Sequence, residues 1–169
     1  MVKTTLLSNQ WWDVNVPYVK EFPKRQHQTD EFVAHAKIGV FVLFFSFYES
    51  IIRVLLRAVL PGACNNAFDA FASVYNCLLT HLNLKQHISL LDFARTIRNL
   101  IHNNGVYINK SGKSETLLFN GQTYLFEHGK KVTYAFPDLF LAIYERILML
   151  SDDINAQADI IGLPSMPTS

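Results

Sequence analysis

The stretch LLDFARTIRNLIHNNG, residues 90–105, has the pattern of an amphipathic helix followed by a stop signal. Apolar residues recur three and four positions apart, which places them on one side of a helix. They are Leu90, Phe93, Ala94, Ile97, Leu100 and Ile101. Ser89 and Asp92 predict a capping box at the helix start, in which each side chain accepts a hydrogen bond from a free backbone N–H. Gly105 predicts the left-handed residue that ends the helix.

A second face of this helix carries cations and one titratable ring. At 3.6 residues per turn, this face holds Leu91, Arg95, Arg98 and His102, with Asn99 at its edge. Arg95 and His102 are two turns apart, or about 10 Å along the axis. The apolar Leu91 predicts that this face is covered, either by another helix of the chain or by a second copy of it.

The run IRNLIHNNGVY resembles the signature of the HEPN superfamily, whose members are small helical bundles with an R-x4-6-H motif late in one helix. Arg95 and His102 fit this motif with six intervening residues. Arg98 and His102 have three, so the Arg98-Asn99 pair is one residue short of the common R-N-x-x-x-H form. The choice between the two arginines as the catalytic one stays open.

The resemblance implies a metal-independent endoribonuclease of the kind that serves as a toxin or defence effector. The substrate 2′-hydroxyl attacks the adjacent phosphate and leaves 2′,3′-cyclic phosphate and 5′-hydroxyl ends. His102 would transfer the proton, because the ordinary histidine pKa of about 6.5 lies near neutrality. Arg95 and Arg98 would bind the phosphate, since a guanidinium donates to two oxygens at once. Asn99 and Asn103 would orient these groups.

The partners implied by the resemblance are an RNA substrate, a second copy whose motif faces the first, and an antitoxin-like protein that blocks the site. The alternative function is a non-catalytic HEPN-like module that dimerises or binds RNA or protein. A purely structural alternative stays open as well. In it Glu49, on the preceding long helix, pairs with Arg95 or Arg98, while His102 only caps the helix end.

No cofactor or metal is expected. His81, His87 and His102 lack the spacing of a zinc site, and the chain has no phosphate-cradling glycine loop or nucleophile elbow. The net charge of +1 excludes a general attraction to nucleic acid, although residues 84–114 carry five basic residues and one acidic residue.

The predicted fold is mainly α, a HEPN-like bundle of four main helices within one domain of 169 residues. The helices are expected near residues 30–60, 64–82, 90–105 and 137–152, with Gly105 closing the third. Residues 106–136 form a small antiparallel insertion of two or three strands, because Asn-Gly at 120–121 predicts a hairpin. The third strand would be residues 131–136. The insertion would act as a flap over the polar face or, alternatively, as a lid on the bundle core.

The two ends of the chain are expected to lie outside the bundle helices. Residues 1–28 would form an arm in which Trp11, Trp12 and Tyr18 pack on the bundle, the alternative being base stacking by the tryptophans. Residues 153–169 would form a flexible tail.

The cellular location is predicted to be the cytoplasm. Cys64 and Cys77 show no metal or redox spacing and are expected to be free thiols, and the N-terminus lacks the apolar core of a signal peptide. The apolar run 38–48 is about half the length of a membrane span, and Glu49, Arg53 and Arg57 follow it. The long helix is therefore expected to be central to a bundle or covered by a subunit, and not to contact a membrane.

Overall fold

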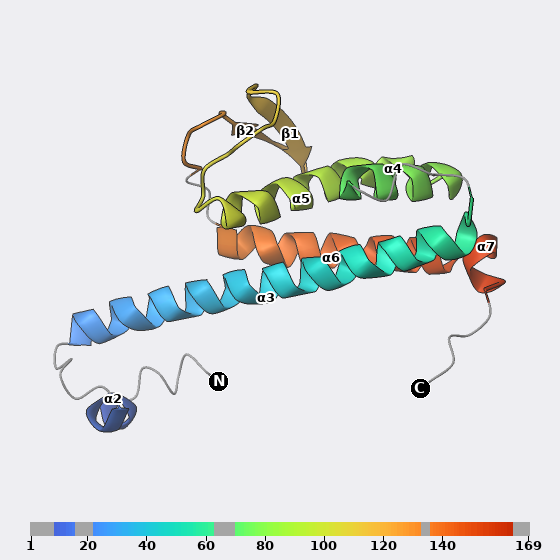
Figure 1. Ribbon diagram of the computed structural model, residues 1–169. Coiled ribbons are helices and arrows are strands. Elements are labelled where there is room, and N and C mark those ends of the chain that lie inside the picture. Colours follow the sequence, from blue (N-terminus) through green and yellow to red (C-terminus); the bar gives the residue numbers. More distant parts are fainter. Residues whose placement is uncertain (1–8, 16–21, 63–69, 133–135, 164–169) are drawn as a thin grey trace. The chain divides into compact units, whose positions relative to one another are not determined.

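The computed structural model describes residues 9–15, 22–62, 70–132 and 136–163 (Figure 1). Over these residues the chain is mainly helical with one two-stranded antiparallel sheet, which confirms the prediction of a mainly α fold with a small antiparallel insertion. The chain divides into two compact units, residues 1–41 and 42–169. Helix α3, Phe22–Val59, contributes its first part to one unit and the remainder to the other.

The N-terminal unit holds α2, Asn9–Asn15, and the first part of α3. Helix α3 begins before the predicted Asp30, so the last part of the predicted arm is helical. Arg25 is buried, and its Nη2 donates to Asp13 Oδ1 at 2.7 Å, which joins the two helices. Trp12 is buried as well, which removes its ring from any base-stacking surface in this conformation.

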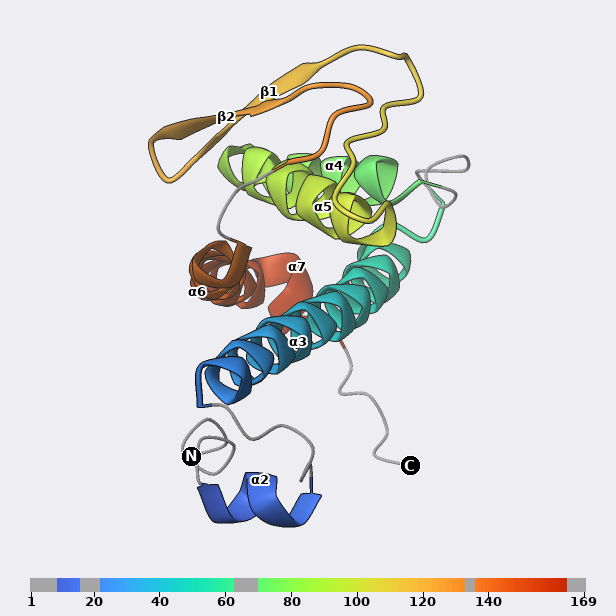
Figure 2. The ribbon, with the colours of Figure 1, turned by 90° about the vertical axis from the view of Figure 1, so that its left-hand side faces the viewer.

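The described residues of the second unit form four further helices and a short 3-10 turn. These elements are α4 (Phe71–His81), η1 (Lys85–His87), α5 (Ile88–His102), α6 (Phe136–Asn155) and α7 (Ala158–Ile161). Within this unit, α4 and α5 lie over α6 and the C-terminal part of α3 (Figure 2). Edge-to-face ring contacts of Phe45 with Phe71 and of Phe44 with Tyr144 hold α3 against α4 and α6.

The hairpin is confirmed where Asn-Gly predicted it. Strands β1, Glu115–Phe119, and β2, Gln122–Phe126, pair in register across Asn120 and Gly121, whose φ angles of 49° and 76° suit a two-residue turn. Phe119 stacks on Phe93 of α5 with ring centroids 4.5 Å apart. The hairpin therefore covers apolar surface of the bundle, as the lid alternative proposed.

The predicted third strand is not formed in the described residues. Lys131 makes a single bridge to Val106, residues 133–135 lie outside the described part, and Phe136 already begins α6. The backbone of the described residues 130–132 instead bonds to Gly105 and Tyr107 of the loop after α5, and not to β2.

The predicted flexible tail, residues 153–169, begins with helical residues. Helix α6 runs to Asn155, and α7 follows it. His81 and His87 bond to Asp159 and Asp153 at 3.0 and 2.8 Å. These contacts tie the turn between α4 and α5 to the C-terminal segment.

Cys77 is not a free thiol, contrary to expectation, because its sulfur is in a disulfide. Sequence spacing does not show whether two sulfur atoms approach each other in the fold. Cys64 and Tyr18 lie outside the described residues.

Candidate functional site

The start of α5 differs from the predicted capping box. The helix begins at Ile88, directly after η1, and its cap residue His87 makes no side-chain capping bond. Ser89 is exposed, and Asp92 points to another partner. The preceding 3-10 turn brings the chain into the helix already coiled, so no capping box is required.

The end of α5 lies one residue before the predicted end. Asn104 adopts the left-handed conformation at φ 53°, and its N–H donates to Ile101 O. The N–H of Gly105 donates to Leu100 O at 2.7 Å. This pair of bonds is the Schellman motif, with Asn104 rather than Gly105 as the first residue beyond the cap.

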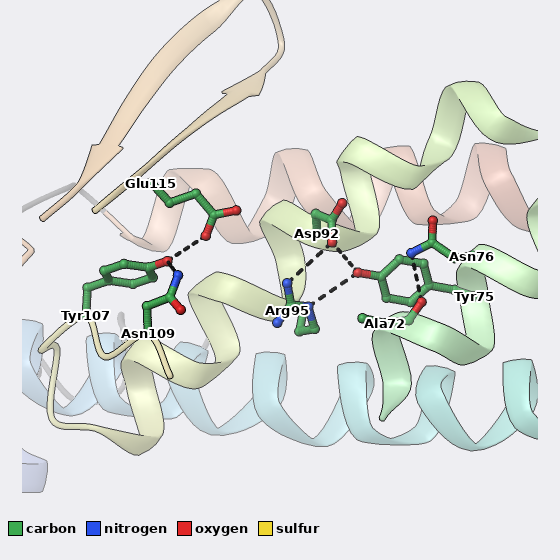
Figure 3. A network of polar contacts seen from close by, with 8 residues as sticks. All are labelled: Ala72, Tyr75, Asn76, Asp92, Arg95, Tyr107, Asn109 and Glu115. Atoms are coloured by element: carbon green, nitrogen blue, oxygen red, sulfur yellow. Dashed lines mark hydrogen bonds and ion pairs between the residues drawn. The ribbon is translucent and has the colours of Figure 1, made fainter. Parts of the chain in front are cut away.

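Arg95 is held by a polar network between α4 and α5 (Figure 3). The fully buried Tyr75 donates its hydroxyl proton to Asp92 Oδ1. Arg95 donates through Nε to the Tyr75 oxygen at 3.3 Å, and its Nη2 lies 3.4 Å from Asp92 Oδ1. Burial raises the pKa of Tyr75 above its ordinary value, and the bond to Asp92 adds to the rise. Burial lowers the pKa of Arg95, but Tyr75 and Asp92 outweigh this effect and the net change is upward.

The Arg95 side of α5 borders a cavity of about 350 Å³. The residues that line it come from α5, from the loop that follows and from the start of β1. They are Arg95, Thr96, Asn99, Leu100, Asn103, Tyr107, Ile108, Asn109, Lys110 and Glu115. We call this space the Arg95 cavity. Two cations and three amides among the lining residues can donate hydrogen bonds to an anionic or polar ligand.

The opposite wall of the Arg95 cavity is built around Tyr107. Its hydroxyl donates to Glu115 Oε2 at 2.5 Å and accepts from Asn109 Nδ2 at 3.0 Å (Figure 3). Burial raises the pKa of Tyr107, and the bond to Glu115 raises it further. Backbone bonds between Tyr107 and the 129–130 turn fix this loop against the hairpin.

Arg98 does not line the cavity and instead faces α3. Its Nη2 lies 3.7 Å from Glu49 Oε2, and Glu49 Oε1 accepts from Arg53 at 2.7 Å. Arg98 Nε is buried and makes no hydrogen bond with any described residue. The predicted ion pair of Glu49 is therefore made with Arg98, whereas Arg95 pairs with Asp92.

The remaining predicted residues have different surroundings. Asn99 and Asn103 line the Arg95 cavity, while His102 is exposed in the last turn of α5 and is not among the lining residues. Leu91 is fully buried within the single chain. Its burial therefore needs no second copy, and coverage by the same chain is the correct alternative.

The structure brings some, but not all, of the predicted residues together. Arg95, Asn99 and Asn103 share the cavity, Arg98 is engaged with Glu49, and His102 lies at the surface. Sequence reasoning missed the residues of the opposite wall, which are Tyr107, Asn109, Lys110 and Glu115. Tyr107 ends the run IRNLIHNNGVY, but no motif includes Asn109, Lys110 or Glu115, which only the geometry of the loop and hairpin brings to the Arg95 cavity.

Two further observations concern metals and membranes. Among the residues that the structure describes, no three histidine, cysteine, aspartate or glutamate side chains gather as a metal-binding group. Within the same residues, one helical stretch, Lys24–Val59, is long and apolar enough to cross a membrane. Mostly buried core helices of soluble proteins and signal sequences meet the same criterion, and 22% of the most apolar part of this stretch is buried.

No protein-family model, curated protein or solved structure matches the chain. The likeness to the HEPN superfamily therefore rests on the residues of α5 and the loop after it.

Proposed function

We propose that this chain is a HEPN-like RNA-binding module in which the Arg95 cavity holds a backbone phosphate and its neighbouring nucleotide. The observation that supports this most is the cavity lining, which combines Arg95 and Lys110 with the amides of Asn99, Asn103 and Asn109. Guanidinium and ammonium groups bind phosphate oxygens, and amides suit the polar edges of bases and ribose. RNA, rather than another anion, follows from the resemblance of IRNLIHNNGVY to the HEPN signature.

The electrostatics of the Arg95 cavity favour a ligand with both charged and neutral polar parts. Glu115 lies on the wall opposite Arg95 and would repel a second phosphate. One phosphate near Arg95 and Lys110, with an uncharged base or ribose near Glu115, suits the charges of both parts of the Arg95 cavity. Asp92 occupies only part of the donor capacity of Arg95, because a guanidinium has five N–H groups.

RNA cleavage is the second candidate function, favoured by the exposure of His102 at the end of α5, next to Asn103, which lines the cavity. In this function His102 transfers the proton and Arg95 stabilises the phosphorane, without a metal ion. Arg98 is a less suitable phosphate ligand because it faces Glu49. Arg95 is accordingly the arginine we assign to the phosphate.

Binding is tested by measuring the affinity for a fluorescent single-stranded RNA at several salt concentrations. Lys110→Ala should weaken binding and lower the salt dependence by about one phosphate contact. Lys113→Ala is the matched control, because Lys113 is an exposed lysine of the same loop that does not line the cavity. Equal affinities for Lys110→Ala, Lys113→Ala and the unmodified chain would contradict RNA binding at this site.

Cleavage is tested by incubating RNA with the protein in EDTA and analysing the product ends. The second candidate predicts cyclic phosphate ends that disappear with His102→Ala and persist with His35→Ala, which changes an exposed histidine of α3. Intact RNA, or cleavage that survives His102→Ala, removes the nuclease candidate and leaves the binding proposal standing.

A further inference from the structure

Helix α3 is apolar on two opposite sides over residues 42–59. Its core side carries the buried Phe45, Ile52 and Leu56. The opposite side carries exposed Leu43, Phe47, Ile51 and Val54. Leu43 and Phe47 are 73% and 67% exposed, values unusual for two large neighbouring apolar side chains on one helix.

Helix α6 extends this exposed apolar surface. Its Leu141 and Leu148 are 62% and 58% exposed and lie two turns apart. Between them in sequence, Tyr144 contacts Phe44 of α3 with ring centroids 4.4 Å apart. Because successive residues on a helix point about 100° apart, the exposed apolar residues of α3 and of α6 lie farther from the core than the Phe44–Tyr144 contact does. Figure 2 shows this C-terminal part of α3 beside α6, with α4 and α5 on their other side.

We define the α3/α6 apolar face by the exposed side chains of these two rows. They are Leu43, Phe47, Ile51 and Val54 of α3 and Leu141 and Leu148 of α6. Together they expose on the order of 700 Å², close to the roughly 800 Å² that each partner buries in a stable interface.

The borders of the α3/α6 apolar face are polar. Exposed Ser50 and Arg57 flank the row on α3, and exposed Glu145 and Asp152 flank the row on α6. A lipid-facing surface would have to take the charges of Arg57, Glu145 and Asp152 out of water, at a cost of a few kcal/mol each. An apolar strip with a charged rim is instead typical of a protein interface.

We propose that a second copy of this chain docks on the α3/α6 apolar face and forms a two-fold symmetric dimer. A symmetric interface places the same patch on both copies, so the patch must complement itself. An uncharged strip meets this condition, because two identical charged strips would repel each other. The three- and four-residue spacing along α3 also suits helix-to-helix packing.

This dimer goes beyond the proposed RNA binding and does not depend on it. Arg98 faces α3, whereas Asn99 and Asn103 line the cavity on a different side of α5. Docking through α3 and α6 therefore leaves both Arg95 cavities open to solvent. The dimer expected from the resemblance differs, since it would bring the two α5 motifs together.

Sedimentation velocity of the full chain over a wide concentration range tests this dimer. The unmodified chain should sediment as a dimer, and Leu43→Glu and Leu148→Glu should each weaken dimerisation by about tenfold or more. Leu118→Glu is the matched control, because Leu118 is 61% exposed on β1, away from both helices. Circular dichroism checks that each variant is folded, which is expected since all three side chains are exposed.

Three outcomes would overturn the proposal. The first is a monomer at every concentration, and the second is a dimer that Leu43→Glu and Leu148→Glu leave unchanged. The third is a monomer that floats with phosphatidylcholine vesicles in a density gradient, which would assign the α3/α6 apolar face to a lipid surface.

Discussion

Replacing Tyr75 by phenylalanine tests the polar network that holds Arg95. The ring is fully buried and would remain, so the change removes only the hydroxyl that bonds to Asp92 and Arg95. Hydrogen bonds to charged groups typically contribute about 1.5–3 kcal/mol each. Asp92 and Arg95 are each about one-third exposed, at 31% and 30%, so water can replace part of the loss.

We therefore expect Tyr75→Phe to lower the free energy of unfolding by about 1–2 kcal/mol. Urea denaturation measures the change, with the m-value checking that the compactness of the unfolded state is unaltered. Tyr124→Phe is the control, since its hydroxyl bonds to Gln122 within the same hairpin strand. A loss below about 0.5 kcal/mol for Tyr75→Phe, equal to that of the control, would refute the view that this network stabilises the α4–α5 contact.

Three further predictions concern stability. Burial raises the pKa of Tyr48 to about 12. Because the unfolded side chain loses its proton near pH 10, the unfolding free energy should fall as the pH rises from about 10 to 12. Tyr48→Phe should flatten that slope, as measured by denaturation curves at about pH 9 to 12. Glu49→Gln should cost about 1–2 kcal/mol, since it removes the charge that faces Arg98 and Arg53, and an unchanged urea midpoint would contradict this pairing. Gly121→Ala should cost about 1 kcal/mol, because its φ of 76° disfavours a side chain, whereas an equal or higher melting temperature would show that the turn tolerates one.

Local patterns predicted the elements of the second unit well. The apolar spacing of α5, the stop signal close to its end and the hairpin at Asn120-Gly121 depend on neighbouring residues, so the sequence contains the information. The start of α5 was wrong because a 3-10 turn, rather than Ser89, leads into it. Asp92 was predicted to cap the helix for the same reason, but in the structure its carboxylate bonds to Tyr75 and Arg95.

Long-range contacts account for what could not be predicted at the candidate site. Glu115 and Tyr107 reach the Arg95 cavity because the Val106–Lys131 bridge and the hairpin fold this segment back on α5. The ion pair of Glu49 with Arg98 was among the alternatives, because both polar positions lie on predicted helices. Which of Arg95 and Arg98 pairs with Glu49 depends on how α5 packs against α3, and local sequence patterns do not contain that information.

The RNA-binding proposal is tested most directly by NMR titration of the side-chain amides with a short single-stranded RNA. We expect the Nδ2 signals of Asn99 and Asn103 and the Nε signal of Arg95 to shift together on one saturating curve. The Nδ2 signal of Asn120, an exposed turn residue, should stay in place. Saturation that shifts Asn120 or other distant signals while Asn99, Asn103 and Arg95 stay unchanged would contradict the account.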